Sequence, residues 1–228
     1  MRSTYIIGKL RPAVALATLA ILVTPGCGEQ SGVTGGPPTS ISAARRDVQA
    51  SDFAKAVFDR STAIDNKWFP LTPGTQLRYI GSSVEDGQRL HHRVVFTITD
   101  LTKVIDGVET VVAWDRDYTT GELVEEELVF FAQDNGGNVW HLGQYPEVYE
   151  NGRLVETPAW ITGVEGARAR VFVRADPRLG SSDYSQGFAP KPINWIDRAR
   201  VYKTGAHTCV PAGCFDDVII IEEFELDK

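Results

Sequence analysis

The chain of 228 residues contains 43% hydrophobic and 23% charged residues, a balance typical of one globular domain with a packed core and not of a disordered or integral membrane protein. Its formal charge is -7. Phosphate binding requires clustered Lys and Arg, and the sequence has no such cluster, so we expect no nucleic-acid partner.

Residues 1–26 have the order of a secretory signal peptide. A basic start, with Arg2, Lys9 and Arg11, precedes the apolar stretch AVALATLAILV at residues 13–23. This stretch is about 11 residues long, whereas a bilayer-spanning helix needs roughly 20, so we expect it to be cleaved off rather than to span a membrane. Loss of its three positive charges takes the formal charge from -7 to -10.

Lipoprotein signal peptides are cut between a small residue and the cysteine that follows it. Gly26 and Cys27 form such a pair. We therefore expect Cys27 to carry diacylglycerol and an acyl group such as palmitate, which would anchor the protein outside the cytoplasm to the bacterial cell membrane. Thr24 replaces the aliphatic residue that usually stands three positions before the cysteine. A soluble secreted product is therefore the alternative.

The next two segments lead into the folded domain. Residues 27–40 are rich in Gly, Pro and Ser and are expected to form a flexible tether. Residues 41–63 contain no Gly or Pro, and Val48, Phe53 and Val57 share one face at helical spacing. This pattern predicts a helix over 41–63 that packs on the domain.

Residues 64–228 read as an antiparallel β domain. Turn signals at residues 86–87, 106–107, 120–121, 135–137 and 151–152 separate runs rich in Val, Phe, Trp, Tyr and Thr. The pattern predicts a mainly β fold, with a meander of about six strands forming a curved sheet or a partly open barrel. From 157 to 196 Gly and Pro interrupt the pattern, and loops that carry a site are expected there.

Four segments of this domain carry a resemblance to known proteins. They are NKWFPLTPGT at residues 66–75, KVIDGV at 103–108, AQDNGGNVWHLG at 132–143 and YENG at 149–152. Over residues 64–228 the chain resembles a widespread group of uncharacterised secreted bacterial proteins and lipoproteins. The resemblance implies export and a β-rich fold, but no reaction. The group is also loosely similar to the curved sheets of lipoprotein carriers, an analogy of fold only.

The remaining cysteines, Cys209 and Cys214, enclose a turn with the sequence CVPAGC. Disulfides persist outside the cytoplasm, so we expect a structural disulfide between them. Two unpaired thiols, or a redox or metal-binding role, are the alternatives.

No catalytic or metal motif stands out. The four histidines have neither HxH nor HExxH spacing, and GxSxG is absent, so we expect no metal, no cofactor and no catalytic residues. Asp115 with Asp117, and Glu125 with Glu127, would each project from one strand face. Paired carboxylates can hydrolyse glycosides, but a solvated sheet face is the expectation here.

The tryptophans are the candidate ligand contacts, since aromatic side chains line apolar pockets or stack on sugars. We expect a role for Trp114, Trp140, Trp160 and Trp195, with Trp160 and Trp195 exposed. The sequence thus predicts a membrane-tethered, non-catalytic protein that binds an apolar or amphipathic small ligand. An envelope interaction module that binds a protein or a cell-wall glycan is the second hypothesis, and a hydrolase or cyclase without a recognisable motif is the third.

Overall fold

The computed structural model describes residues 2–7, 53–85 and 87–224, and strands account for 62% of them. Cys27, the tether expected at residues 27–40 and the first half of the expected helix lie outside these described ranges. Within them, no helix has the length and hydrophobicity needed to cross a membrane. The sheets are antiparallel and do not close into a barrel, so the expected mainly β, antiparallel fold is confirmed.

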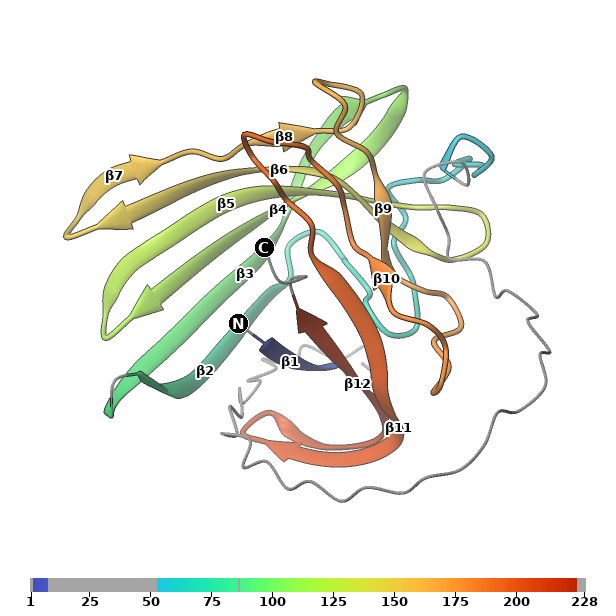
Figure 1. The fold of residues 1–228 in the computed structure, drawn as a ribbon. Helices are drawn as coiled ribbons and strands as arrows, with labels where there is room; N and C mark the ends of the chain where they lie inside the picture. Colours follow the sequence, from blue (N-terminus) through green and yellow to red (C-terminus); the bar gives the residue numbers. More distant parts are fainter. Residues whose placement is uncertain (1, 8–52, 86, 225–228) are drawn as a thin grey trace, which may run out of the picture.

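The larger sheet is a meander of consecutive hairpins, in the order β2-β3-β4-β5-β6-β7, and is curved in Figure 1. Two short strands, β8 and β9, also pair with β6. The bounds are β2 Gln76–Glu85, β3 Gln88–Ile105, β4 Val108–Thr119, β5 Glu122–Gln133, β6 Val139–Glu150, β7 Arg153–Glu156, β8 Trp160–Ile161 and β9 Arg170–Val173.

Two of the predicted turns show why these hairpins form. The β3–β4 turn has φ of 48° at Asp106 and 80° at Gly107, and the β6–β7 turn has φ of 50° at Asn151 and 71° at Gly152. Two successive residues with positive φ make the type I′ turn, whose twist matches that of the flanking strands and which favours Asn-Gly and Asp-Gly. The turn residues therefore set the register of the meander.

The smaller sheet has the order β1-β12-β11-β10 and lies across one face of the larger sheet, as Figure 1 shows. We call this face of the larger sheet, which carries Val111, Ala113, Val129 and Phe131, the inner face. The outer edge of β12 pairs with β1, a strand from the segment expected to be the signal peptide. The bounds are β1 Arg2–Ile7, β10 Tyr184–Ser185, β11 Arg198–Val210 and β12 Gly213–Phe224.

The main core lies between the two sheets and is built around Phe131. The ring centroid of Phe131 lies 5.1 Å from that of Phe172 and 5.6 Å from that of Phe69. Ile219 and Ile221 of β12 are each 1% exposed and belong to the same cluster. Burial of this apolar surface holds the smaller sheet on the larger one.

A second apolar cluster covers part of the outer face, around Phe130, Trp140 and Leu142. The segment that begins at Phe53 packs on it, with the Phe53 ring centroid 5.3 Å from that of Trp140. The expectation of a helix is wrong for residues 54–63, which form turns and irregular backbone. The reason is a competing set of hydrogen bonds.

Two local turn bonds, from the N–H of Ala56 to the carbonyl of Phe53 and from the N–H of Ala63 to the carbonyl of Arg60, are the backbone bonds within the described part of this segment, and other carbonyls bond to the β5–β6 hairpin. The carbonyl of Val57 accepts from the N–H of Asn135 at 2.8 Å, and the carbonyl of Ser61 accepts from the N–H of Gln133 at 2.8 Å. These tertiary bonds satisfy the backbone groups without a regular helix. Tertiary contacts therefore override the helical periodicity of the sequence.

We predict that Gly143→Ala destabilises the fold. Gly143 lies in β6 at φ 149°, and a Cβ there would lie 2.5 Å from the carbonyl oxygen of Trp160. The overlap forces β6 and β8 apart, at a cost on the order of 2 kcal/mol in the free energy of unfolding by urea denaturation.

Gly180→Ala is the matched control, because Gly180 also has a positive φ of 76° but has no atom within 4 Å of the added Cβ. It should cost only the backbone strain, about 1 kcal/mol. Equal losses in the two variants would show that the contact with β8 is unimportant.

Candidate functional site

An open groove of about 580 Å³ lies beside the β3–β4 hairpin. Its walls come from the hairpin, from the loop that contains β8, and from residues 189–193, so most of it is built by the Gly- and Pro-rich stretch of the sequence. The lining is largely apolar, and two of its valines are well exposed, Val104 at 68% and Val164 at 55%. The apolar lining residues include Trp160, Ile161, Val164, Pro190, Pro192 and Ile193.

Of the four tryptophans proposed as ligand contacts, only Trp160 lines this groove. It is 4% exposed, so its expected exposure is wrong: its ring is packed against Trp195, with the centroids 5.3 Å apart. Trp195 is half-buried. The other two lie elsewhere.

Trp140 is 1% exposed in the outer cluster, where its indole N–H donates to Asp134 at 2.7 Å. Trp114 lies on the outer face of β4, half-buried under the guanidinium of Arg116, 4.0 Å from the ring centroid. Sequence reasoning missed the apolar groove residues Ile161, Val164 and Ile193, because single aliphatic residues in an irregular segment carry no periodic signal.

A buried histidine lies behind the tryptophan pair. The ring centroid of His141 lies 4.8 Å from Trp160 and 5.2 Å from Trp195, and its Nε2 lies 3.1 Å from the carbonyl oxygen of Gly143. Burial lowers the pKa of His141 to about 3. The ring is therefore neutral at physiological pH and serves as a packing element of the groove's back wall.

Four carboxyl groups form a second feature, which we call the inner acidic cluster: Asp115, Asp117, Glu125 and Glu127. Asp115 pairs with Glu127 and Asp117 with Glu125 across β4 and β5. All four occupy the inner face, because they continue the alternation of the buried residues on the same two strands.

The structure contradicts the expectation of a solvated sheet face. The side chains are half-buried, and three of their oxygens, Asp115 Oδ1, Asp117 Oδ1 and Glu127 Oε2, are fully buried with no hydrogen-bond partner among the described residues. The signal was present in the sequence: both strands alternate in phase with the core positions. We expected a solvated face because the residues are charged, although their positions in the alternation match those of the core residues.

Burial raises the pKa of every carboxyl in the inner acidic cluster. The pKa of Asp115 rises to about 7, mainly by desolvation and further by its carboxylate neighbours Asp117 and Glu125. The pKa of Glu127 lies well above its ordinary value for the same reasons. Across the interface, burial raises the pKa of Glu223 on β12 to about 7. Such carboxyls can give or take a proton near neutral pH.

The cluster is not arranged as a compact metal site. In the described part of the chain, the one group of three or more His, Cys, Asp or Glu side chains whose ligand atoms lie within 4.8 Å of one another is His207, Cys209 and Cys214. That group lies on the β11–β12 hairpin, where the expected disulfide between Cys209 and Cys214 is confirmed.

Comparison with known proteins adds no relative: no protein-family model, curated protein or solved structure matches the chain. The resemblance to a group of secreted bacterial proteins therefore stays an expectation from the sequence.

The raised pKa values predict that the fold loses stability as the pH rises. The folded state holds protons up to about pH 7 at Asp115, whereas an unfolded Asp releases them near pH 4. The contribution of these groups is thus most favourable below about pH 4 and declines to its minimum above about pH 7. Glu127→Gln should raise the free energy of unfolding at pH 8 by on the order of 1 kcal/mol and should flatten its pH dependence.

Urea denaturation at pH 5 and pH 8 measures both effects. Glu122→Gln, at an exposed position of the same strand, is the control and should leave the pH dependence unchanged. A Glu127→Gln protein that is no more stable than the wild type at pH 8 would contradict the assignment of a desolvated, destabilising carboxyl.

Proposed function

We propose that this protein is a non-catalytic binding protein, anchored by lipid outside the cytoplasm to the bacterial cell membrane, whose groove accepts an apolar or amphipathic small ligand. The observation that carries the proposal is the groove itself. Its volume of about 580 Å³ falls in the range of small-molecule sites, which are mostly apolar with a few polar groups.

The chemistry of the groove favours a ligand with both apolar and polar parts. Trp160, Ile161 and Ile193 offer apolar surface, while Lys103 and Lys191 bring positive charge and Asp106 and Glu165 negative charge to the same lining. Burial of an apolar chain in the groove would contribute favourably to the binding free energy. A polar head group could pair with charged side chains of either sign.

The arrangement of titratable groups favours binding over catalysis. Among the described residues, four carboxyls with raised pKa values lie on the inner face and a fifth, Glu223, lies on β12, and none of them lines the groove. An acid–base catalyst needs such groups in contact with its substrate. A ligand in the groove would contact none of them.

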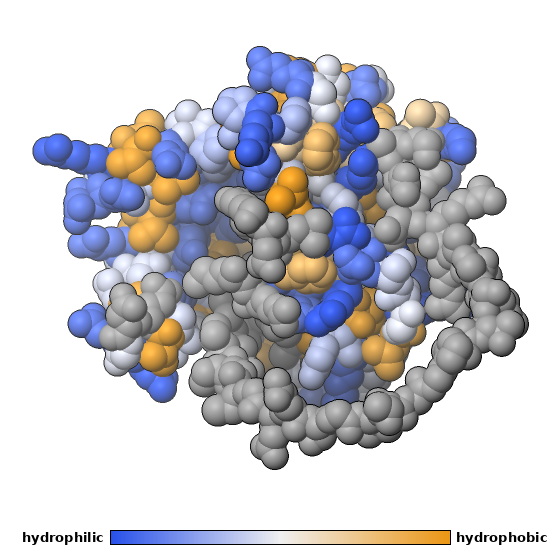
Figure 2. Space-filling model, in the orientation of Figure 1, coloured by the Kyte–Doolittle hydropathy of each residue, from blue (hydrophilic) through white to orange (hydrophobic). Residues whose placement is uncertain are grey.

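A second candidate function is an envelope interaction module, favoured by the exposed strand β7. All four of its residues are exposed, including Leu154 at 52% and Val155 at 46%, and hydrophobic residues are visible over this end of the sheet in Figure 2. In the described part of the sheet no strand pairs with the outer edge of β7, and an edge of this kind can accept a strand from a partner.

We predict that the protein carries a ligand when it is isolated from the cell envelope of its host bacterium. Native mass spectrometry should show an extra mass that organic extraction removes, whereas a covalent lipid would stay. Val164→Glu, which places a charge in the apolar lining, should reduce occupancy about tenfold, equivalent to roughly 1.4 kcal/mol of binding free energy.

The control is Leu179→Glu, because Leu179 is 61% exposed but does not line the groove, and occupancy should be retained. A wild-type protein with a clean apoprotein mass would reject ligand binding in favour of the interaction module. Cross-linking at β7 would then identify the partner. An adduct that persists equally in Val164→Glu would place the ligand outside the groove.

We further predict that the anchor depends on Cys27. Cells fed labelled palmitate should incorporate label into the wild-type protein, and Cys27→Ser should abolish it and shift the protein into the soluble fraction, since the acyl chains supply the membrane affinity. Cys209→Ser is the matched control and should keep the label. Labelling of Cys27→Ser at the wild-type level would show that the lipid is attached elsewhere.

A further inference from the structure

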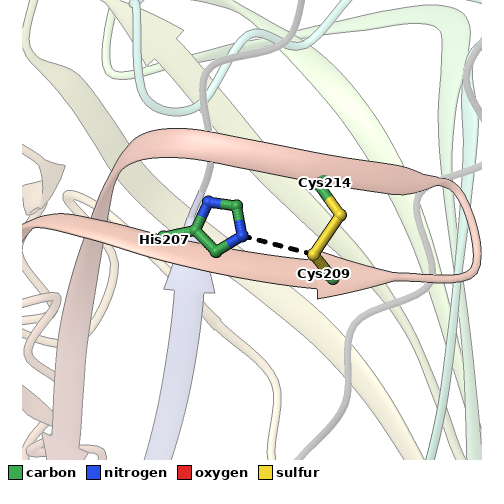
Figure 3. Close-up of side chains that lie close together, drawn as sticks. All are labelled: His207, Cys209 and Cys214. Atoms are coloured by element: carbon green, nitrogen blue, oxygen red, sulfur yellow. Dashed lines mark hydrogen bonds between the residues drawn. A yellow bond between two sulfur atoms is a disulfide. The ribbon is translucent and has the colours of Figure 1, made fainter.

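The tip of the β11–β12 hairpin carries a disulfide in an unusual chemical setting. Cys209 and Cys214 face each other in register across the two strands and form the disulfide seen in Figure 3. Both residues are exposed, and neither belongs to an apolar core cluster. The bond is therefore open to an external thiol.

A histidine and a carboxylate flank only one end of this disulfide. His207 and Cys209 share a face of β11 because they are two residues apart, and Nε2 of His207 lies 3.3 Å from Sγ of Cys209. On the other side of the ring, Nδ1 lies 2.7 Å from Oδ1 of Asp216 on β12. Asp216 thus orients the imidazole so that its second nitrogen faces the sulfur of Cys209.

We propose that this hairpin tip is a thiol–disulfide exchange site in which an external thiolate attacks Cys214 and Cys209 is the leaving group. The inference rests on the contacts of the hairpin and is independent of ligand binding in the groove. The two sulfurs are not equivalent, because the imidazole contacts only Cys209. A nearby imidazolium stabilises a thiolate, and the sulfur that leaves as the more stable thiolate leaves faster.

The reaction partner is a dithiol, such as the active site of a thiol–disulfide oxidoreductase. Its first thiolate forms a bond to Sγ of Cys214, the Cys209–Cys214 bond breaks, and the electron pair moves to Sγ of Cys209. Because Nδ1–H donates to Asp216, Nε2 carries a hydrogen only in the imidazolium form, and in that form it hydrogen-bonds to this thiolate and can transfer the proton to it. The second thiolate of the partner then attacks the partner's first sulfur, which is bonded to Cys214 in the mixed disulfide. Cys214 leaves as a thiolate. The dithiol releases two protons to water as it forms its thiolates, and two return to the cysteine pair, one to Cys209 through His207 and one to Cys214 from water. Two electrons pass from the dithiol, which becomes a disulfide, to the cysteine pair.

The position of the bond allows the exchange to run without unfolding. The disulfide closes a sequence separation of only five residues, and the entropic stabilisation from so short a loop is small. Strand pairing continues beyond the hairpin tip, through Ala206 with Val218 and Val201 with Ile221. Opening the bond therefore changes the chemistry of the tip and leaves the packing of β11 and β12 in place.

The test uses the full-length protein and glutathione as a monothiol probe. After brief exposure and acid quenching, tandem mass spectrometry locates the glutathione adduct. We expect it predominantly on Cys214. His207→Asn should slow adduct formation several-fold and distribute the adduct between both cysteines, a change of position that a merely structural role would not produce.

Two further variants complete the design. Asp216→Asn should give a smaller decrease in rate, because Asp216 acts by positioning His207. His91→Asn, at another exposed histidine on β3, is the control and should match the wild type, and thermal melts verify that all variants are folded. An adduct mainly on Cys209, an unchanged rate and distribution in His207→Asn, or no adduct at all would overturn the proposal and leave a structural disulfide only.

Discussion

The contact on which the rest of the structure depends is the packing of the smaller sheet on the inner face of the larger one around Phe131. The Phe131 ring contacts Phe69, Phe96, His141 and Phe172, which come from four separate parts of the chain. Aromatic rings that meet edge to face add a specific geometry to the burial of apolar surface. Ile219 and Ile221 of β12 belong to the same cluster and bring the smaller sheet into contact with these rings.

Strands β4 and β5 show how one face of a sheet can serve two purposes. Val111, Ala113, Val129 and Phe131 fill the core, and the inner acidic cluster occupies the same face further along the strands. Desolvating four neighbouring carboxyls opposes folding. The apolar half of the same strands offsets that cost, because a strand that pairs in register carries both halves to one side.

The groove and the disulfide hairpin lie away from this core. The groove is built from loops around β8, which are fixed by its short pairing with β6 at Gly143 and Gln144. The hairpin projects from the smaller sheet and ends in exposed side chains. Rigid sheets that carry variable loops and turns let surface chemistry change without altering the fold. A ligand in the groove and a thiol at the hairpin would therefore act independently.

The sequence by itself determined the antiparallel meander, its turns and the cysteine pair, because strand alternation, Asp-Gly and Asn-Gly signals and a short CVPAGC spacing are local in the chain. Only the tertiary structure decided the course of residues 53–63, the burial of Trp140 and Trp160, and the inner acidic cluster. The first two depend on partners distant in sequence, the β5–β6 hairpin and the rings of Phe53 and Trp195, and the third depends on the burial of the inner face. Periodicity shows which residues share one face of a strand, but the neighbouring element decides whether that face is exposed to solvent or buried.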